Sequence, residues 1–373
     1  MNILGYAPQM ASYGGMERHV CGLSAALASS GHRVELLTTS NSLGAEFRSL
    51  LLSSGVKFRE LPLRREQALN ASQGVRKALW LLSEVIRARR TQWDIIYTNG
   101  QSALSRIAWL AGRRGTRRIH HHHTAADKSE QATWSPSFRR VLATAPELVA
   151  CSRATRDSLA SALGRSDVTF LPYLAGCPVE AEAVHDRAYN AGSPLQFGFA
   201  GRLVREKGIG SILELSRRPE LASVRWHLHG SGADYPPEPM AAYPNVHYHG
   251  AWTERSAQAA ALLALDALVL FSQHNEGMPL SLIEGMSAGL PWVATDRGGT
   301  GELAISGPNC LLLSGAPDLG ALSTAVLQMA ARLRRGATSR TAQRRAYDAH
   351  FSPKAVSAAW RDYFEQPKRS GVG

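Results

Sequence analysis

Short apolar runs alternate along the chain with longer stretches of helical periodicity. Each run has the length of a buried strand, and the segments between the runs repeat their apolar residues every three or four positions. The predicted strands lie at residues 1–6, 34–38, 93–98, 118–123, 147–150, 168–172, 195–200, 224–229, 246–249, 267–271 and 291–295. This alternation predicts an α/β fold with parallel sheets and helices on both faces.

The length of the chain and one break in the pattern predict two domains. A chain of 373 residues is too long for a single ordinary core. Residues 176–194 are rich in Gly, Pro, Ala and charged residues and lack periodicity, which is typical of a linker. We therefore expect one Rossmann-like domain at residues 1–175 and a second at 195–351, followed by a terminal helix within 352–373.

Charge is concentrated in the first half of the chain. Residues 1–172 contain 23 Lys and Arg against 12 Asp and Glu, an excess of +11, whereas residues 173–373 contain 19 against 18. A basic half indicates an anionic partner, which could be nucleic acid, an anionic membrane surface or a phosphate-bearing substrate.

Residues 74–90 have the pattern of a basic amphipathic helix. One helical stripe contains the apolar residues Val75, Leu79, Leu82 and Ile86, and the cations of the segment are Arg76, Lys77, Arg87, Arg89 and Arg90. Such a helix can lie on a membrane. It can equally pack on its own sheet and leave a basic face in solvent, and the sequence leaves both interpretations open.

Two carboxylates eight residues apart lie across a predicted strand-to-helix turn. Glu276 follows the strand at 267–271, and Pro279 suits the first position of a helix that ends near Gly289, so Glu284 lies about a turn and a half into that helix. Open α/β sheets bind ligands at such turns. The free N–H groups of a helix start, together with ionised carboxylates, can bind the hydroxyls of a sugar or ribose.

Two further loops follow predicted first strands. Arg202 and Lys207 lie five residues apart in a loop that leads into a helix, where two cations can flank a pyrophosphate. Gly14 and Gly15 occur after the first strand of the chain, where glycine allows backbone amides to approach a ligand. No G-x-G-x-x-G fingerprint follows either strand, which argues against a dehydrogenase.

These motifs together resemble those of a known family. The pattern E-G-x-P-x-x-x-x-E at 276–284 with the A-G-x-P at 288–291, the G-R-L-x-x-x-K-G at 201–208 and the paired glycines at 14–15 are similar to signatures of retaining GT-B glycosyltransferases of glycosyltransferase family 4. The resemblance implies two Rossmann-like domains facing each other across a cleft. The first would be the acceptor side, the second would bind the nucleotide sugar, and a C-terminal helix would cross back to the first.

The resemblance also implies roles for individual residues. Glu284 would hold the ribose hydroxyls of the donor and Glu276 the hydroxyls of the transferred sugar, while Arg202 and Lys207 would neutralise the diphosphate. The implied catalytic residues are His123, Glu276, Arg202 and Lys207, and the implied donor-binding residues are Gly14, Gly15, Arg202, Lys207, Glu276, Gly277, Met278, Pro279 and Glu284.

The histidine run at 120–123 ends a predicted strand. Side chains alternate along a strand, so His121 and His123 share one face. By resemblance, His123 lies beside the donor sugar and the acceptor, with His121 as the second choice. A metal tract is the weaker interpretation because no third ligand is indicated. The chain departs from the family pattern at Tyr173, where the usual turn has Asn.

The predicted function is retaining transfer of a hexose-type sugar from a nucleoside diphosphate to a glycan or lipid-linked acceptor hydroxyl, in bacterial surface polysaccharide biosynthesis. No D-x-D motif is present, so we expect no metal, and no cofactor beyond the donor substrate. Sparse cysteines without metal spacing, a start that lacks the features of a secretory leader, and the absence of a long apolar run favour the cytoplasm or the inner face of the membrane.

Two other classes of protein are alternatives to this function. A sugar-nucleotide epimerase on the same fold is disfavoured by the combined glutamate and Arg-Lys motifs. A basic nucleic-acid-binding protein is suggested by the sequence pI of 9.9. However, the arginines are scattered across helices, without aromatic interleaving or a nucleic-acid motif, so no nucleic-acid partner is expected.

Overall fold

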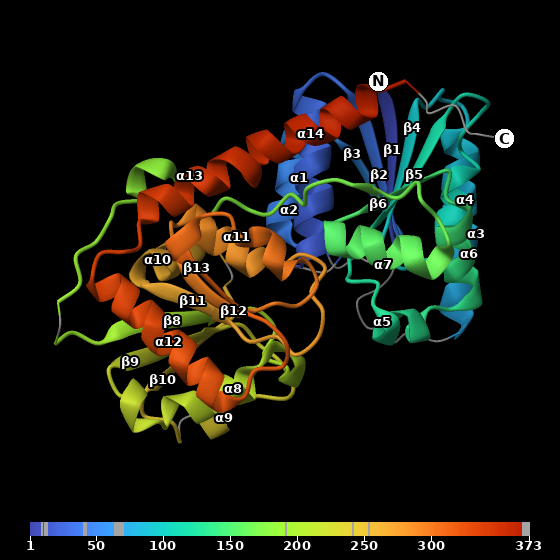
Figure 1. Cartoon of the computed structure of the whole chain (residues 1–373). Helices are drawn as coiled ribbons and strands as arrows, with labels where there is room; N and C mark the ends of the chain where they lie inside the picture. The colour runs from blue at the N-terminus through green and yellow to red at the C-terminus, as the bar shows by residue number, and fades with distance from the viewer. Residues whose placement is uncertain are drawn as a thin grey trace. The chain divides into compact units, whose positions relative to one another are not determined.

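The computed structural model describes residues 1–8, 10, 14–39, 43–62, 71–190, 192–240, 242–252 and 254–367. The chain divides into two compact units (Figure 1). Unit 1 combines Met1–Ala175 with Pro353–Gly373, and unit 2 is Gly176–Ser352.

Unit 1 is built on a parallel sheet of seven strands in the order β3-β2-β1-β4-β5-β6-β7. The strands are β1 (Asn2–Ala7), β2 (Arg33–Thr38), β3 (Lys57–Glu60), β4 (Ile95–Asn99), β5 (Arg117–His122), β6 (Glu147–Ala150) and β7 (Thr169–Phe170). The order reverses between β1 and β4, and the carboxyl ends of strands beside such a switch point are where open α/β sheets bind ligands.

Helices cover both faces of this sheet. They are α1 (Gly15–Ser29), α2 (Ala45–Ser53), α3 (Ala71–Ala88), α4 (Ser105–Trp109), α5 (Lys128–Thr133), α6 (Pro136–Thr144), α7 (Arg153–Leu163) and α14 (Pro353–Glu365). Because side chains alternate along a strand, the sheet contributes to two cores. One core, which contains Ile3 and Leu36, packs against α1, α2 and α14, and the other, with Leu4 and Leu37, packs against α3, α4, α6 and α7.

The terminal helix α14 is part of unit 1, as the predicted GT-B fold requires. Trp360 is completely buried, and its Nε1 donates to the carbonyl of Pro172 at 2.8 Å. Arg117 donates from Nη1 to the carbonyls of Tyr363 and Phe364, at 2.9 and 2.8 Å, and so satisfies the C-terminal end of the helix. These contacts tie the last helix to β5 and to the segment after β7.

Unit 2 is built on a parallel sheet of six strands in the order β10-β9-β8-β11-β12-β13. Its strands are β8 (Leu195–Ala200), β9 (Val224–His229), β10 (Val246–Gly250), β11 (Ala267–Leu270), β12 (Trp292–Thr295) and β13 (Cys310–Leu313), and its helices are α8 (Ile209–Ser216), α9 (Pro237–Met240), α10 (Arg255–Ala264), α11 (Leu280–Ser287), α12 (Leu319–Arg334) and α13 (Arg340–His350). The two sheets confirm the predicted pair of α/β domains.

Strands β3 and β13 were not expected from the sequence. Both lie at a sheet edge, and neither has a fully buried residue. The Lys-Phe-Arg-Glu sequence of β3 is too polar to produce an apolar run. The Cys-Leu-Leu-Leu sequence of β13 is such a run, as long as β11 and β12, and was not picked out.

Helix α3 packs on the unit 1 sheet, but not through the stripe that the sequence made prominent. Its inner face consists of Leu81, Val85 and Ala88, all essentially buried. The expected stripe, Val75, Leu79, Leu82 and Ile86, faces solvent. The helix therefore has two apolar stripes, and periodicity alone could not decide which one faces the sheet.

No helix in the described ranges has both the length and the apolar character needed to cross a bilayer.

Candidate functional site

A lysine and a glutamate meet at the carboxyl ends of β8 and β11. The Lys207 Nζ atom donates to both carboxylate oxygens of Glu276, at 2.6 and 2.7 Å. The hydroxyl of Ser272 also donates to this carboxylate, and His274 Nε2 lies 3.8 Å from it. Glu276 is only 6% exposed, so the pair is held in a fixed geometry beneath the surface.

The Glu276 carboxyl is ionised in this setting. Its burial would raise the pKa, but the charge of Lys207 and the hydrogen bonds from Lys207 and Ser272 outweigh that effect, so the pKa lies below its ordinary value. The carboxylate therefore remains an acceptor of hydroxyl hydrogen bonds throughout the neutral pH range.

Two glycines hold the loops that carry this pair. Gly208, directly after Lys207, has φ of 76°, and a Cβ there would lie 2.2 Å from the carbonyl oxygen of Phe271. Gly298 has φ of 58°, and a Cβ there would lie 2.2 Å from the carbonyl oxygen of Glu276. Only glycine combines this backbone conformation with such close approach. The loops after β8, β11 and β12 are therefore packed against one another at backbone distance.

Arg202 lies in the same loop as Lys207 and is exposed to solvent. Within the part of unit 2 that is described, it has no ion pair, in contrast to Lys207. The structure thus brings Lys207 and Glu276 together and leaves the Arg202 guanidinium available to an incoming anion.

Glu284 lies on α11, which begins one residue later than expected, with Pro279 at its N-cap. The carboxylate is 3% exposed and accepts a 2.8 Å hydrogen bond from Gln258 Nε2. The backbone of Gly176 lies next to this carboxylate, since a Cβ on Gly176 would lie 3.6 Å from Glu284 Oε1. The backbone of Gly277 and Met278 connects Glu276 to this helix start. The two glutamates therefore occupy one continuous strand-loop-helix segment.

In unit 1, Gly14 is the N-cap of α1 and Gly15 its first residue. A Cβ on Gly14 would lie 2.1 Å from Glu17 Oε2, so the carboxylate covers the start of the helix. Residues 11–13, which precede the pair in the predicted loop, lie outside the described residues.

His123 directly follows β5 and is partly exposed. Its Nε2 is 2.9 Å from Asn99 Oδ1, the acceptor of that side chain, which assigns the ring proton to Nε2. Nδ1 then carries a lone pair, and it has no partner among the described residues. Burial, followed by the influence of His19, lowers the pKa well below its ordinary value, so His123 is a neutral hydrogen-bond acceptor at pH 7.

A buried chain of hydrogen bonds lies beside His123. The Leu174 N–H donates to His19 Nδ1 at 2.9 Å, His19 Nε2 lies 3.1 Å from the Tyr97 hydroxyl, and that hydroxyl lies 2.7 Å from His121 Nδ1. Since Nδ1 of His19 accepts, its Nε2 donates, and the Tyr97 proton then points to His121. Burial lowers the pKa of His19 to about 3. His121 is completely buried within this hydrogen-bonded chain, and its ring packs against that of His123. It therefore positions His123 and is not itself exposed to a ligand.

The departure from the family pattern at Tyr173 has a physical reason. The Tyr173 ring stacks on His19, with ring centroids 4.5 Å apart, and the side chain is 4% exposed. The residue that replaces the usual Asn therefore completes the histidine cluster instead of forming a polar turn.

Replacing Tyr97 with phenylalanine tests the hydrogen-bond chain. The change keeps the ring but strips His19 Nε2 and His121 Nδ1 of their shared partner, which costs about 1–3 kcal/mol. We expect the melting temperature of unit 1 to fall by about 2–12 °C, as measured by calorimetry. Tyr248→Phe, which removes a partly exposed hydroxyl from unit 2, is the matched control. An unchanged melting temperature for Tyr97→Phe would contradict the network.

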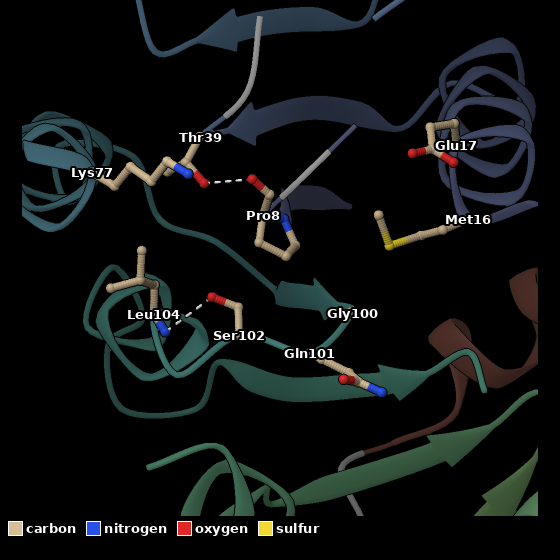
Figure 2. A pocket seen from close by; sticks show the side chains of 9 residues that line it. All are labelled: Pro8, Met16, Glu17, Thr39, Lys77, Gly100, Gln101, Ser102 and Leu104. Carbon is tan, nitrogen blue, oxygen red and sulfur yellow. Dashed lines mark hydrogen bonds between the residues drawn. The ribbon is translucent and has the colours of Figure 1, made fainter. Parts of the chain in front are cut away.

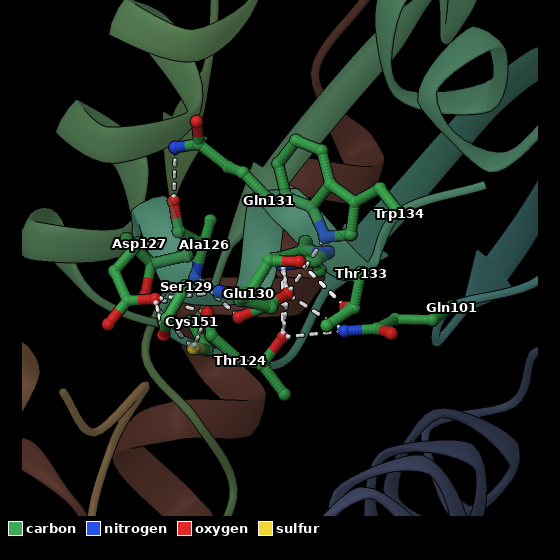
Figure 3. Close-up of polar contacts among 12 residues, drawn as sticks. Gln101, Thr124, Ala126, Asp127, Ser129, Glu130, Gln131, Thr133, Trp134 and Cys151 are labelled. Carbon is green, nitrogen blue, oxygen red and sulfur yellow. Dashed lines mark hydrogen bonds and ion pairs between the residues drawn. The ribbon is translucent and has the colours of Figure 1, made fainter. Parts of the chain in front are cut away.

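A second polar network, centred on Glu130, fixes the loop after β5 (Figure 3). Glu130 accepts hydrogen bonds from Thr124 Oγ1 at 2.7 Å, Gln101 Nε2 at 2.8 Å and the N–H of Ala126 at 2.7 Å, and His122 Nε2 lies 2.9 Å away. Burial acts to raise the pKa of this carboxyl, but the hydrogen bond and charge of His122, followed by the hydrogen bonds from Thr124 and Ala126, lower it to about 2. Glu130 thereby holds Ala126 at φ of 55° and orients the loop that begins at His123.

A cavity of about 540 Å³ opens at the carboxyl ends of β1, β2 and β4 (Figure 2). Its lining mixes charged, polar and apolar side chains, contributed by Pro8, Met16, Glu17, Thr39, Lys77, Gly100, Gln101, Ser102 and Leu104. This is the edge of the sheet at which the strand order reverses, where a ligand is expected.

Three residues that contact the predicted site residues were not predicted from the sequence. Ser272, Gln258 and Asn99 each make a direct hydrogen bond to a predicted site residue. Asn99 and Ser272 lie at or just after the end of an apolar run, which was the available signal. Gln258 lies on a neighbouring helix, and nothing in the sequence indicated its contact with Glu284.

Comparison with protein families divides the chain in the same way as its fold. A family model described as a glycosyl transferase 4-like domain matches residues 14–173, and one described as glycosyl transferases group 1 matches residues 194–332. Together they cover most of the chain. No curated protein matches the sequence significantly.

Solved structures share the fold over nearly the whole chain. Anabaena HepE in complex with UDP and glucose has a TM-score of 0.74 at 18% identity, covering 97% of this chain and 99% of that one. Sucrose-phosphate synthase from Thermosynechococcus elongatus has a TM-score of 0.76 at 18% identity, with coverage of 98% and 99%. WaaG, a glycosyltransferase involved in lipopolysaccharide biosynthesis, has a TM-score of 0.66 at 14% identity, with coverage of 97% and 99%.

Proposed function

Since the chain belongs to the GT-B glycosyltransferases, with a glycosyl transferase 4-like domain and a glycosyl transferases group 1 domain, we propose that it transfers a hexose-type sugar from a nucleoside diphosphate with retention of configuration. The acceptor is a hydroxyl of a glycan or of a lipid-linked intermediate. The observation that carries this proposal is the contact of Lys207 with the buried Glu276 carboxylate, together with the exposed Arg202 guanidinium in the Lys207 loop, which has no ion pair with a described residue.

The donor bridges these charges. Lys207 and Arg202 bind the diphosphate, and as the glycosidic bond breaks they stabilise the negative charge that develops on its leaving oxygen. Glu276 accepts hydrogen bonds from the sugar hydroxyls, and Glu284 from those of the ribose. Lys207 already contacts Glu276 in the structure. The cation and the carboxylate are therefore positioned before the donor binds, and binding does not require these two side chains to rearrange.

Retention follows when the acceptor attacks from the side on which the diphosphate departs. The bond between the anomeric carbon and the diphosphate oxygen breaks, a bond to the acceptor oxygen forms, and the acceptor's proton passes to the leaving diphosphate oxygen. His123 contributes a neutral Nδ1 acceptor, which can orient a sugar or acceptor hydroxyl without taking its proton. No side chain needs to form a covalent intermediate.

The transfer needs neither a metal nor a cofactor in this proposal. The sequence lacks a D-x-D motif, and Arg202 with Lys207 supplies the positive charge that the departing diphosphate requires. Adding EDTA is therefore expected to leave the transfer rate unchanged.

The biological setting is the synthesis of a bacterial surface polysaccharide on the cytoplasmic side of the membrane. WaaG is involved in lipopolysaccharide biosynthesis, and WaaB, a lipopolysaccharide outer core galactosyltransferase, also shares this fold, with a TM-score of 0.70 at 17% identity. Support for a donor class comes from HepE, which was solved with UDP-glucose. UDP-hexoses are accordingly the first donors to test.

A donor panel tests the proposal directly. A ligand that binds only the folded protein raises its melting temperature, so UDP-, GDP- and ADP-sugars are compared by thermal shift. The best donor, radiolabelled, is then assayed for hydrolysis and transfer, and proton NMR of the product gives its anomeric configuration. Absence of donor binding together with absence of turnover would contradict an enzyme of this class, and an inverted product would contradict retention. DNA binding tighter than donor binding would favour the nucleic-acid alternative.

A further inference from the structure

Helix α3 presents an apolar face to solvent. Val75, Leu79, Leu82 and Ile86 are 63%, 63%, 39% and 62% exposed. Nine large hydrophobic side chains are exposed among the described residues, and four of them lie on this one helical face instead of being scattered singly. A continuous exposed apolar face of this kind marks an interaction surface.

The orientation of this face is fixed by ion pairs on the inner side of the helix. The Arg87 guanidinium contacts the carboxylates of Glu35, on β2, and Glu84, while Arg59, on β3, reaches Glu84 at 2.9 Å. Both glutamates are at least nine-tenths buried. Rotating α3 to bury its outer stripe would break these contacts and leave buried carboxylates unpaired, which is strongly disfavoured.

Cations border the outer stripe. At about 100° per residue, Arg76 lies on the helix beside the stripe, and Arg89 and Arg90 follow in the turn directly after the helix ends at Ala88. Both Arg89 and Arg90 are exposed, and Glu84, the one acidic residue in 74–90, is turned inward. A narrow apolar stripe between cations is complementary to an anionic lipid surface, whose head groups pair with arginine while its acyl boundary takes the apolar side chains.

We propose that α3 is a membrane-docking helix, whose outer stripe inserts at the head-group boundary of an anionic bilayer. The inference rests on the proposed function in one respect: it selects the lipid-linked class of acceptor over a free glycan. The inner side of the same helix supplies Lys77 to the cavity at the switch point of the unit 1 sheet (Figure 2). Docking through α3 would therefore hold that cavity beside the lipid surface, within reach of the polar part of a membrane-anchored acceptor.

Co-sedimentation with vesicles tests the proposal without requiring activity. The wild-type protein is expected to bind vesicles of phosphatidylcholine with phosphatidylglycerol at low salt, and to bind pure phosphatidylcholine and high-salt samples much more weakly. Replacing the four stripe residues by glutamine, which keeps helix propensity, is expected to weaken binding at least tenfold. Arg89→Gln with Arg90→Gln should weaken it about 25-fold, from about fivefold for each cation.

The matched control replaces exposed apolar residues elsewhere. Ile305→Gln with Leu327→Gln, which are 44% and 39% exposed in unit 2, should leave vesicle binding unchanged. The stripe variant should also keep the wild-type melting temperature and donor-induced thermal shift, so loss of membrane binding is distinct from failure of the proposed function. Equal sedimentation of the stripe variant and the wild type, or no sedimentation of the wild type, would overturn the proposal. A wild-type dimer that dissociates in the stripe variant would assign this face to a second copy of the chain.

Discussion

Replacing Lys207 with methionine is expected to lower kcat/KM for sugar transfer by about 100- to 1000-fold, the effect of removing one group that stabilises developing negative charge. The change removes the positive charge from the diphosphate site and also leaves Glu276, 6% exposed, without its cation. The pKa of the Glu276 carboxyl should then rise. Steady-state kinetics between pH 5 and pH 9 would show both the loss of rate and an acidic limb displaced to higher pH.

Arg205→Met is the matched control for this experiment. Arg205 is an exposed cation in the same short 3-10 helix as Lys207, and it makes no ion pair within the described residues. Its loss should change kcat/KM less than threefold. A double-mutant cycle with Glu276→Gln should give strongly non-additive effects, because the two groups act as a unit. Additive effects, or full activity in Lys207→Met, would remove the pair from the mechanism.

The three completely buried histidines of unit 1 alone are expected to lower its free energy of unfolding by about 3–4 kcal/mol between pH 7 and pH 5.5. His19, His120 and His121 are completely buried, and burial lowers the pKa to about 3 for His19 and His120 and well below the ordinary value for His121. The unfolded chain, with pKa values near 6.5, therefore takes up protons first as the pH falls. Each imidazole contributes about 1 kcal/mol over this range.

The measurement is the melting temperature of the unit 1 transition across this pH range, which should fall by about 6–16 °C. His120→Asn serves as a control, since an amide can still bond to Thr98 Oγ1, the partner of His120 Nδ1 at 3.0 Å, but does not titrate. Its pH-dependent loss should be smaller by the contribution of one imidazole, about 1 kcal/mol. A melting temperature that stays constant down to pH 5.5 would mean that these histidines are not held neutral by burial.

The inner strands of both sheets could be predicted because burial on both faces requires continuous apolar runs. The edge strand Lys57–Glu60 could not, since three of its four residues are charged. Cys310–Leu313 is apolar and was missed although its pattern resembles that of the strands that were predicted. For α3, the sequence contained two apolar stripes of similar strength. The ion pairs of Arg87 with Glu35 and Glu84 select between them, and these join residues up to 52 positions apart, beyond what periodicity records.

The candidate site shows a similar division. Lys207 and Glu276 were singled out by motif, but their mutual contact depends on the packing of loops 69 residues apart in the chain. For the histidine run, strand alternation placed His121 and His123 on one face. It could not indicate that His121 lies beneath the site, bonded to Tyr97, because His19 and Tyr97 come from two other elements.

The terminal helix α14 has a consequence for how the protein is made. Trp360 closes the core beneath His19 and His121, but it is synthesised only after the whole of unit 2. At about 5–20 residues per second on the ribosome, roughly 10–40 s separate the completion of the first sheet from the arrival of this helix. During that interval nascent unit 1 exposes an apolar groove, so it is a natural client for chaperones, whereas unit 2 can fold as soon as it emerges.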